Sequence, residues 1–358
     1  MDTSTPRAKP VRHFVPRAVR RGALRTEGAM AGIPPLQHNT SRIARSAGTP
    51  GRSFGEFTIQ RVIAEGGLGI VMEAVHRTTQ RRLALKTVSP DYRERFDISP
   101  EQVRQLFFHE AQVMAAIDHP HVLPLYDAGL AHPTPKVAVP YLALRLVDGG
   151  DLANRVKSDG GMEEREVLRL AYDCARGLEA IHAAGYVHCD IKPANLLLDR
   201  SGHLRISDFG VACRTGSGAQ GGQIAGTPNY LAPEQISGLP MQPGVDLYSL
   251  GATMHFALTG RPPYTGESVG ETLRRVRAAS APPAPGTLRP GLGADCEAVV
   301  RKALHPDPGQ RYVHARQMIQ DCRSVLDGRS PDHALGRKAR KRTLIGSLFS
   351  RDGAGQEG

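Results

Sequence analysis

The stretch GYVHCDIKPANLLL, residues 185–198, constrains this chain more than any other part of its sequence. Asp190 is followed two residues later by Lys192 and five residues later by Asn195. A carboxylate, an ammonium group and an amide at this spacing bring a proton acceptor, a cation and a metal ligand onto one short loop. Cys189 precedes Asp190, which raises the question of whether the site is broken or only controlled differently.

Residues 54–88 alternate apolar and polar side chains over short runs, interrupted by the sequence EGGLG. The pattern predicts hairpin strands around a flexible loop. In RRLALKTV, residues 81–88, the two-residue period of a strand places Ala84, Lys86 and Val88 on one face. Lys86 is therefore expected to share its face with small apolar neighbours.

A helix is well signalled after this strand. Ser99 is the expected N-cap, Pro100 suits the first helical position, and Gln102 completes a capping box. The inward stripe consists of Val103, Leu106, Phe107, Glu110, Val113, Met114 and Ile117. A carboxylate within an apolar face needs a cationic partner, because an unpaired buried charge costs several kcal/mol. Lys86 is the natural candidate to pair with Glu110.

From about residue 152 the pattern becomes helical. An apolar stripe predicts a helix over 163–184, in which Cys174 is most simply a core residue. Residues 246–258 are apolar nearly all round and predict a buried helix, with Asp246 accepting backbone N–H groups at its start. The expected organisation is a small strand-rich lobe, a linker and a larger helical lobe.

The net charge of +11 is distributed unevenly. Residues 1–53 carry ten Lys and Arg against two acidic residues, and residues 329–358 carry seven against three. The remaining chain holds 29 basic and 30 acidic residues, so the folded part is nearly neutral. Both end segments are rich in Arg, Gly, Ser and Pro without periodicity. We expect basic disordered tails at 1–53 and 329–358 around a folded unit at 54–328.

The tails suit either weak contact with an anionic surface or a solubilising role, and both readings stay open. Because no aromatic residues interleave with the basic ones to stack bases, specific nucleic-acid binding is not expected. No run of about 18 apolar residues occurs, so no membrane span is expected. The N-terminal tail superficially suits an organelle transit peptide. The five cysteines are odd in number and form no CxxC pair, which favours a reducing cytoplasm.

About eight motifs follow one another in the order and near the spacing of the eukaryotic-type (Hanks-type) protein kinases, which the chain resembles over 54–328 in a bacterial style. The resemblance implies an α+β, two-lobed protein kinase fold. A small antiparallel-sheet N-lobe with one key helix would occupy 54–144, a hinge 145–151 and a larger, mainly helical C-lobe 152–328. It also implies ATP as the phosphoryl donor, Mg²⁺ (or Mn²⁺ in its place) as the metal, and proteins as substrates.

The sequence IAEGGLGIV, residues 63–71, looks like the kinase glycine-rich loop, whose backbone N–H groups can approach phosphates. Ala64 stands where the family has its first glycine. Lys86 matches the lysine that holds the α- and β-phosphates, and Glu110 matches the helix glutamate that orients it. Asp151 would hydrogen-bond the ribose. By resemblance, the nucleotide-binding residues are Ala64, Gly66, Gly67, Gly69, Val71, Ala84, Lys86, Leu144, Leu146, Asp151 and Leu197.

The resemblance makes Lys86, Glu110, Asp190 and Lys192 the catalytic residues. Asp190 would orient a substrate hydroxyl and accept its proton, and Lys192 would supply positive charge near the transferring phosphoryl group. Asn195 and Asp208, the latter in SDFG, would be the metal ligands.

Substrate class is implied by DIKPAN and GTPNYLAPE, which resemble the serine/threonine kinases. In that group Lys192 and Thr227 meet near Asp190. Glu234 matches a glutamate that pairs with a late arginine, here Arg311, as a buried structural ion pair.

In many kinases the residue before the catalytic aspartate is an arginine that grips a phosphate on the activation loop. Here that position is Cys189, and the positions of other phosphate partners hold Cys213 and Leu106. Gln223 stands where the phosphate-bearing threonine is usual, four residues before Thr227. Because that arginine takes no part in the transfer itself, the resemblance predicts activity without activation-loop phosphorylation.

Cys189 and Cys213 would point toward a common place, within disulfide range. They either form a reversible disulfide or fill space left by the missing basic residues, and both readings stay open. Two alternatives to an active kinase are a pseudokinase nucleotide-binding scaffold and a chain whose basic tails carry the main function. Autophosphorylation on tail hydroxyls is expected at positions that the sequence does not single out.

Overall fold

The computed structural model describes residues 50–66, 69–89, 99–134, 137–218, 226–278 and 282–336. The expectations for Gly67, for Gln223 and for most of both tails therefore fall outside the described residues. Within the described ranges, every helix is too short or too polar to cross a lipid bilayer.

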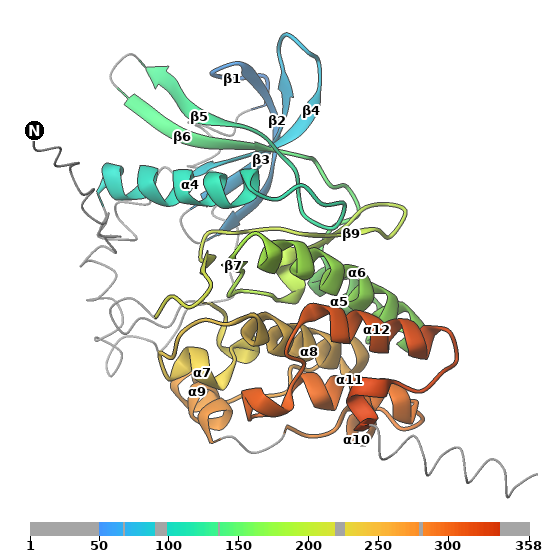
Figure 1. Ribbon diagram of the computed structural model, residues 1–358. Helices are drawn as coiled ribbons and strands as arrows, with labels where there is room; N and C mark the ends of the chain where they lie inside the picture. The colour runs from blue at the N-terminus through green and yellow to red at the C-terminus, as the bar shows by residue number, and fades with distance from the viewer. Residues whose placement is uncertain are drawn as a thin grey trace, which may run out of the picture.

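The smaller lobe is built on a six-stranded antiparallel sheet with the order β1-β2-β3-β4-β6-β5 (Figure 1). Its strands are β1 (Ser53–Phe54), β2 (Phe57–Gly66), β3 (Gly69–His76), β4 (Arg82–Val88), β5 (Leu125–Thr134) and β6 (Val137–Leu144). Alternation along β4 places Leu83 and Leu85 in one apolar cluster and Ala84 and Val88 in another. The predicted inward face that Ala84 and Val88 share with Lys86 is confirmed.

The helix α4 (Pro100–Ala115) packs against β5 and β6. Ser99 and Gln102 form the predicted capping box, which is confirmed. The side chains of Val103, Phe107 and Glu110 are buried, so this helix carries a carboxylate into the apolar interior between the lobes.

The larger lobe is mainly helical. Its helices are α5 (Leu152–Asp159), α6 (Glu164–Ala183), α7 (Pro233–Ile236), α8 (Pro243–Thr259), α9 (Val269–Arg277), α10 (Pro285–Leu288), α11 (Ala294–Ala303) and α12 (Ala315–Leu326). Short strands are β7 (Tyr186–Val187), β8 (Leu196–Leu198), β9 (Leu204–Ile206) and β10 (Cys213–Arg214). The predicted α+β class, with a small sheet lobe and a larger helical lobe, is confirmed.

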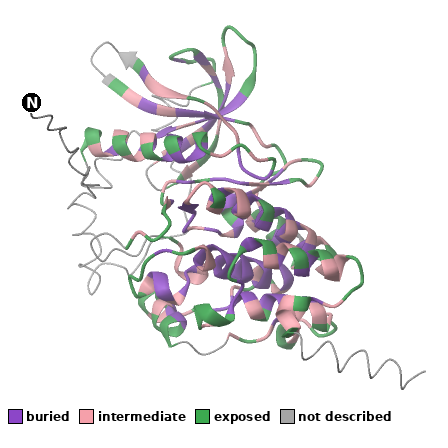
Figure 2. Cartoon of the chain, in the orientation of Figure 1, coloured by how far each residue is buried: buried purple, intermediate pink, exposed green. Residues whose placement is uncertain are grey.

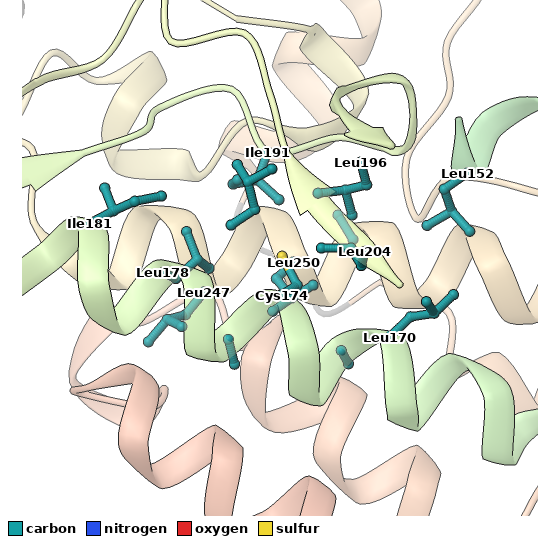
Figure 3. Packing of buried hydrophobic residues seen from close by; sticks show 14 of the residues in the cluster. Leu152, Leu170, Cys174, Leu178, Ile181, Ile191, Leu196, Leu204, Leu247 and Leu250 are labelled. Carbon is teal, nitrogen blue, oxygen red and sulfur yellow. The ribbon is translucent and has the colours of Figure 1, made fainter. Parts of the chain in front are cut away.

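Helix α8 forms the centre of this lobe. It is buried nearly all round, as its sequence predicts, and begins three residues before Asp246 (Figure 2). Leu247 and Leu250 of α8 lie in the same cluster as Cys174 and Leu178 of α6 (Figure 3). Cys174 is a core residue, as predicted.

The linker between the lobes follows β6. Asp151 pairs through its backbone with Leu197, and Arg145 donates its N–H to the carbonyl of Pro124 at 3.0 Å. A Cβ on Gly149 would collide with the backbone of Leu198, so this close approach requires glycine.

Candidate active site

Lys86 of β4 and Glu110 of α4 form an ion pair, as their predicted faces require. Lys86 Nζ lies 2.8 Å from Glu110 Oε1 and 2.9 Å from its Oε2. The same nitrogen lies 2.8 Å from Asp208 Oδ1. Burial alone would lower the pKa of Lys86, but the two carboxylates outweigh it and raise that pKa. Lys86 is therefore a fixed cation that joins the sheet, the helix and the larger lobe.

Asp190 lies in the loop between β7 and β8, and its side chain is only 10% exposed. Lys192 Nζ donates to Asp190 Oδ2 at 2.7 Å and to Thr227 Oγ1 at 2.8 Å. Thr227 donates its backbone N–H and its hydroxyl to Asp190 Oδ1, at 3.1 and 3.3 Å. The predicted meeting of Lys192 and Thr227 near Asp190 is confirmed. These contacts fix the orientation of the Asp190 carboxylate.

The carboxylate of Asp246 binds the backbone of the loop that carries Asp190. Its carboxylate accepts the backbone N–H groups of His188 and Cys189, each at 2.9 Å, and a hydrogen bond from His182 Nε2 at 2.8 Å. Burial would raise the pKa of Asp246, but the combined effect of the hydrogen bonds and charges of His182 and His188 outweighs it and the pKa is lowered. The prediction that Asp246 accepts backbone N–H groups holds, but they come from the loop before Asp190 and not from its own helix start.

Backbone strain concentrates at two positions beside the site. Cys189 has φ +67° and Asp208 has φ +65°, in the left-handed region that residues other than glycine rarely adopt. Two hydrogen bonds hold the backbone of Cys189. Its N–H donates to the carboxylate of Asp246, and its carbonyl accepts from Gln235 Nε2 at 3.0 Å. Sequence reasoning missed Gln235, which carries no signal beyond its position in helix α7.

The segment from Ser207 to Phe209 sets Asp208 beside Lys86. Phe209 is fully buried, and its ring packs edge-on against His188 with centroids 4.8 Å apart. His188 Nε2 in turn lies 3.1 Å from the carbonyl oxygen of Ser207. The aromatic contact therefore ties the loop of Asp190 to the segment of Asp208.

The residues expected to bind a nucleotide gather where the two lobes meet. Ala84 pairs with Leu144 across β4 and β6, and Val71 pairs with Lys86 across β3 and β4. Five apolar side chains of the expected set belong to one cluster: Val71, Ala84, Leu144, Leu146 and Leu197.

The facing ends of β2 and β3 include Val71 of this cluster. Ala64 pairs with Val71, and Gly66 pairs with Gly69. Asp151 also caps helix α5, because its Oδ1 accepts the N–H of Asn154 at 2.8 Å.

Asn195 and Asp208 fit a magnesium ion held between protein and phosphates. Asn195 donates its amide nitrogen to Asp190, at 2.9 Å to the carbonyl and 3.1 Å to Oδ2, which leaves the amide oxygen as the donor atom for a cation. Burial opposes ionisation of Asp208, but the ammonium of Lys86 outweighs it and lowers the pKa of that carboxyl. Two hard oxygen donors suit Mg²⁺, which usually takes its other ligands from phosphate and water.

The described residues after Asp208 are attached to the larger lobe by protein groups. Strand β10 pairs with β7, and the guanidinium of Arg214 lies 4.2 Å from the ring centre of Tyr186. Thr215 donates its N–H to the carbonyl of Gly185 at 3.0 Å.

Two further contacts extend this attachment. Met241 exchanges backbone hydrogen bonds with Gly216 and Ser217, at 2.8 and 2.9 Å. His109 of α4 lies 2.9 Å from the carbonyl of Ala212, so the segment also contacts the smaller lobe.

Two other predicted pairs are also found together. Arg311 Nη2 donates to Glu234 Oε2 at 3.0 Å, and both side chains are buried, which confirms the predicted structural ion pair. Cys189 Sγ and Cys213 Sγ lie 3.5 Å apart, which confirms that these side chains face each other.

Comparison with known proteins supports the same reading of the site. The protein kinase domain family model matches residues 57–322. A probable serine/threonine-protein kinase of Streptomyces coelicolor is 34% identical over 285 residues, which are 78% of this chain and 41% of that relative. The serine/threonine-protein kinases PknB and PknA of Mycobacterium tuberculosis are each 33% identical, over 79% and 77% of this chain. The chain spans 45% of the length of PknB and 63% of the length of PknA.

Proposed function

The chain belongs to the protein kinase family, and on that premise we propose that it transfers the γ-phosphoryl group of ATP to serine and threonine hydroxyls of proteins. The observation that carries the proposal is the Asp190 carboxylate, held by Lys192 and Thr227 in the loop that also carries Asn195. This arrangement supplies a proton acceptor and a cation where a phosphoryl acceptor would be oriented.

Asp190 accepts the proton of the substrate hydroxyl as the hydroxyl oxygen attacks the γ-phosphorus. Lys192 stabilises the negative charge that develops on the transferring group. Its ammonium lies 2.7 Å from the Asp190 carboxylate, so the positive charge is already beside the group that accepts the proton. Thr227 keeps both side chains in place, because it accepts a hydrogen bond from Lys192 and donates two to Asp190.

Lys86 binds the α- and β-phosphates, and Glu110 holds its ammonium in position. The adenine lies between Val71 and Ala84 on one side and Leu197 on the other, with Leu144 and Leu146 at the entry to the linker. Ala64, Gly66, Gly67 and Gly69 bind the phosphates, and Asp151 hydrogen-bonds the ribose.

Asn195 and Asp208 would hold Mg²⁺, or Mn²⁺ in its place. When bound, the metal neutralises phosphate charge. The protein's own contribution is to fix these two donors: Asn195 through its hydrogen bonds to Asp190, and Asp208 through Lys86.

Activity does not require phosphorylation of the segment between Asp208 and Thr227. Cys189 and Cys213 replace basic residues that could bind such a phosphate. In support of this, β10 pairs with β7, and the backbones of Thr215 and Gly216 bond to the larger lobe, so residues 213–216 are attached to it by protein groups. Autophosphorylation on tail hydroxyls accompanies this activity. The odd number of cysteines and the lack of a CxxC pair support a reducing compartment, the cytoplasm.

The test is incubation of the purified chain with magnesium and ATP, alone and with a generic basic protein substrate, beside Asp190→Ala. Phosphoserine or phosphothreonine should form with the wild type only. Nucleotide binding without any phosphoryl transfer by the wild type would overturn the proposal.

A further inference from the structure

Two of the five cysteines lie against each other beside the candidate active site. Cys189 Sγ and Cys213 Sγ are 3.5 Å apart and hydrogen-bonded. Cys174, Cys296 and Cys322 are buried in the larger lobe. A chemical change at the thiols of Cys189 and Cys213 would therefore act on the loop that carries Asp190.

The backbone around the pair is fixed on both sides. Cys213 belongs to β10 and pairs directly with Val187 of β7, two residues before Cys189. The N–H of Cys189 is held by Asp246 and its carbonyl by Gln235. A disulfide needs a sulfur separation of about 2.05 Å, so the two sulfurs must approach by about 1.5 Å. Rotation of the side chains can supply much of this distance while the paired backbones stay in register.

The two thiols differ in a way that suits stepwise oxidation. Cys189 is 4% exposed, whereas Cys213 is only half-buried and can be reached from solvent. The hydrogen bond from Cys189 lowers the pKa of the Cys213 thiol against the opposing effect of burial. The same hydrogen bond, together with burial, raises the pKa of Cys189. Cys213 is therefore the thiolate that meets an oxidant, and Cys189 is the resolving thiol.

We propose that Cys189 and Cys213 form a redox modification site, at which a peroxide creates a disulfide that ties β10 to the loop carrying Asp190. The Cys213 thiolate attacks one peroxide oxygen, the O–O bond breaks, and hydroxide leaves with formation of a sulfenic acid. The Cys189 thiol then loses its proton and attacks the Cys213 sulfur, and the sulfenic oxygen leaves as water. Two thiols are thereby oxidised and one peroxide is reduced to two waters; a dithiol reverses the bond by exchange.

The disulfide locks the present arrangement of the segment. Strand β10 already pairs with β7, and Lys86 is already joined to Glu110 and Asp208 in the same structure. A covalent bond between the cysteines therefore adds a constraint to an assembled site and does not pull it apart. This effect on activity rests on the proposed kinase function, whereas formation of the bond does not.

The first experiment treats the reduced full chain with a few equivalents of hydrogen peroxide and maps its peptides without reduction. A peptide linking Cys189 to Cys213 should form in most molecules and disappear with dithiothreitol. It should be absent from Cys189→Ser and Cys213→Ser and present in the control Cys296→Ala. Sulfinic acid at Cys213 without a linked peptide would overturn the proposal, as would equal oxidation of the buried cysteines.

The second experiment measures the consequence on the same samples. Backbone amides of Cys213 and Thr215 should exchange their hydrogens at least tenfold more slowly in the oxidised protein, because Cys213 pairs with Val187 and Thr215 donates its N–H to Gly185. The rate of phosphoryl transfer should stay within twofold of the reduced form. A tenfold loss on oxidation, or unchanged exchange, would overturn the locking role. No transfer by either form would contradict the proposed kinase function and leave the linkage and exchange results standing.

Discussion

The fully buried carboxylate of Asp246 accepts the backbone N–H of Cys189 through Oδ1 at 2.9 Å. Fifty-seven residues separate the two along the chain, so helix α8 directly holds the strained backbone position that precedes Asp190. The position of Asp190 thus depends on a buried residue of another element.

Asp246→Asn is expected to reduce the free energy of unfolding by about 3 kcal/mol, because it removes a buried charge that accepts three hydrogen bonds. Urea titration measures this loss. Asp118→Asn, at an exposed position, is the matched control and should change stability by less than about 0.5 kcal/mol. Equal effects of the two substitutions would contradict the role given to Asp246.

Lys86→Met should lower kcat/KM for phosphoryl transfer by about 10²-fold or more, because it removes a fixed positive charge from the phosphate-binding position. Lys157→Met, on the exposed face of α5, should leave the rate unchanged. Initial rates with magnesium and ATP provide the measurement. Full activity of Lys86→Met in a folded protein would refute the assignment.

Thr227 contacts both Asp190 and Lys192, and its hydroxyl can be removed at nearly constant volume. Thr227→Val should lower kcat by about tenfold while the affinity for ATP stays the same, because the substitution disturbs positioning and not nucleotide contacts. Thr227→Ser keeps the hydroxyl and should recover most of the loss. If Thr227→Ser did not recover the lost kcat, the role of Thr227 would be purely steric.

Glu73 accepts hydrogen bonds from Arg82 at 2.6 Å and Arg61 at 2.8 Å in the smaller lobe. The hydrogen bond from Arg82 chiefly lowers the pKa of Glu73 below its ordinary value of 4.5, against the effect of burial. A carboxylate with a lowered pKa stabilises the fold above its unfolded pKa and loses this contribution as pH falls through its folded pKa. The stability difference between wild type and Glu73→Gln should therefore be constant from about pH 8 to 5 and shrink below about pH 4. A difference that grows on acidification would contradict the ion pair.

Much of the site can be predicted from the sequence, because a strand period and a helix period each place one of its charged side chains. The strand period fixed the face of Lys86, the helix period fixed the face of Glu110, and the cost of an unpaired buried charge required the two to meet. The sequence predicts that Asp246 accepts backbone N–H groups, but not that they belong to His188 and Cys189, because every residue type except proline offers such a group. The contact of Gln235 with the carbonyl of Cys189 is hidden for a similar reason, because every residue has a backbone carbonyl.

The short distance between Cys189 and Cys213 is predicted only by the resemblance to protein kinases. The positive φ of Cys189 and the register of β10 against β7 determine it, and both are tertiary features. Short strands of two residues carry too little pattern to be recognised in a sequence.

The proposed phosphoryl transfer needs no phosphate on the segment between Asp208 and Thr227. The most direct test is the rate of phosphoryl transfer by protein treated with phosphatase, with Thr215 and Ser217 monitored by mass spectrometry during the assay and Asp190→Asn as the inactive control. We predict the same initial rate before and after treatment. Loss of activity after treatment, reproduced by Thr215→Ala or Ser217→Ala, would contradict the account.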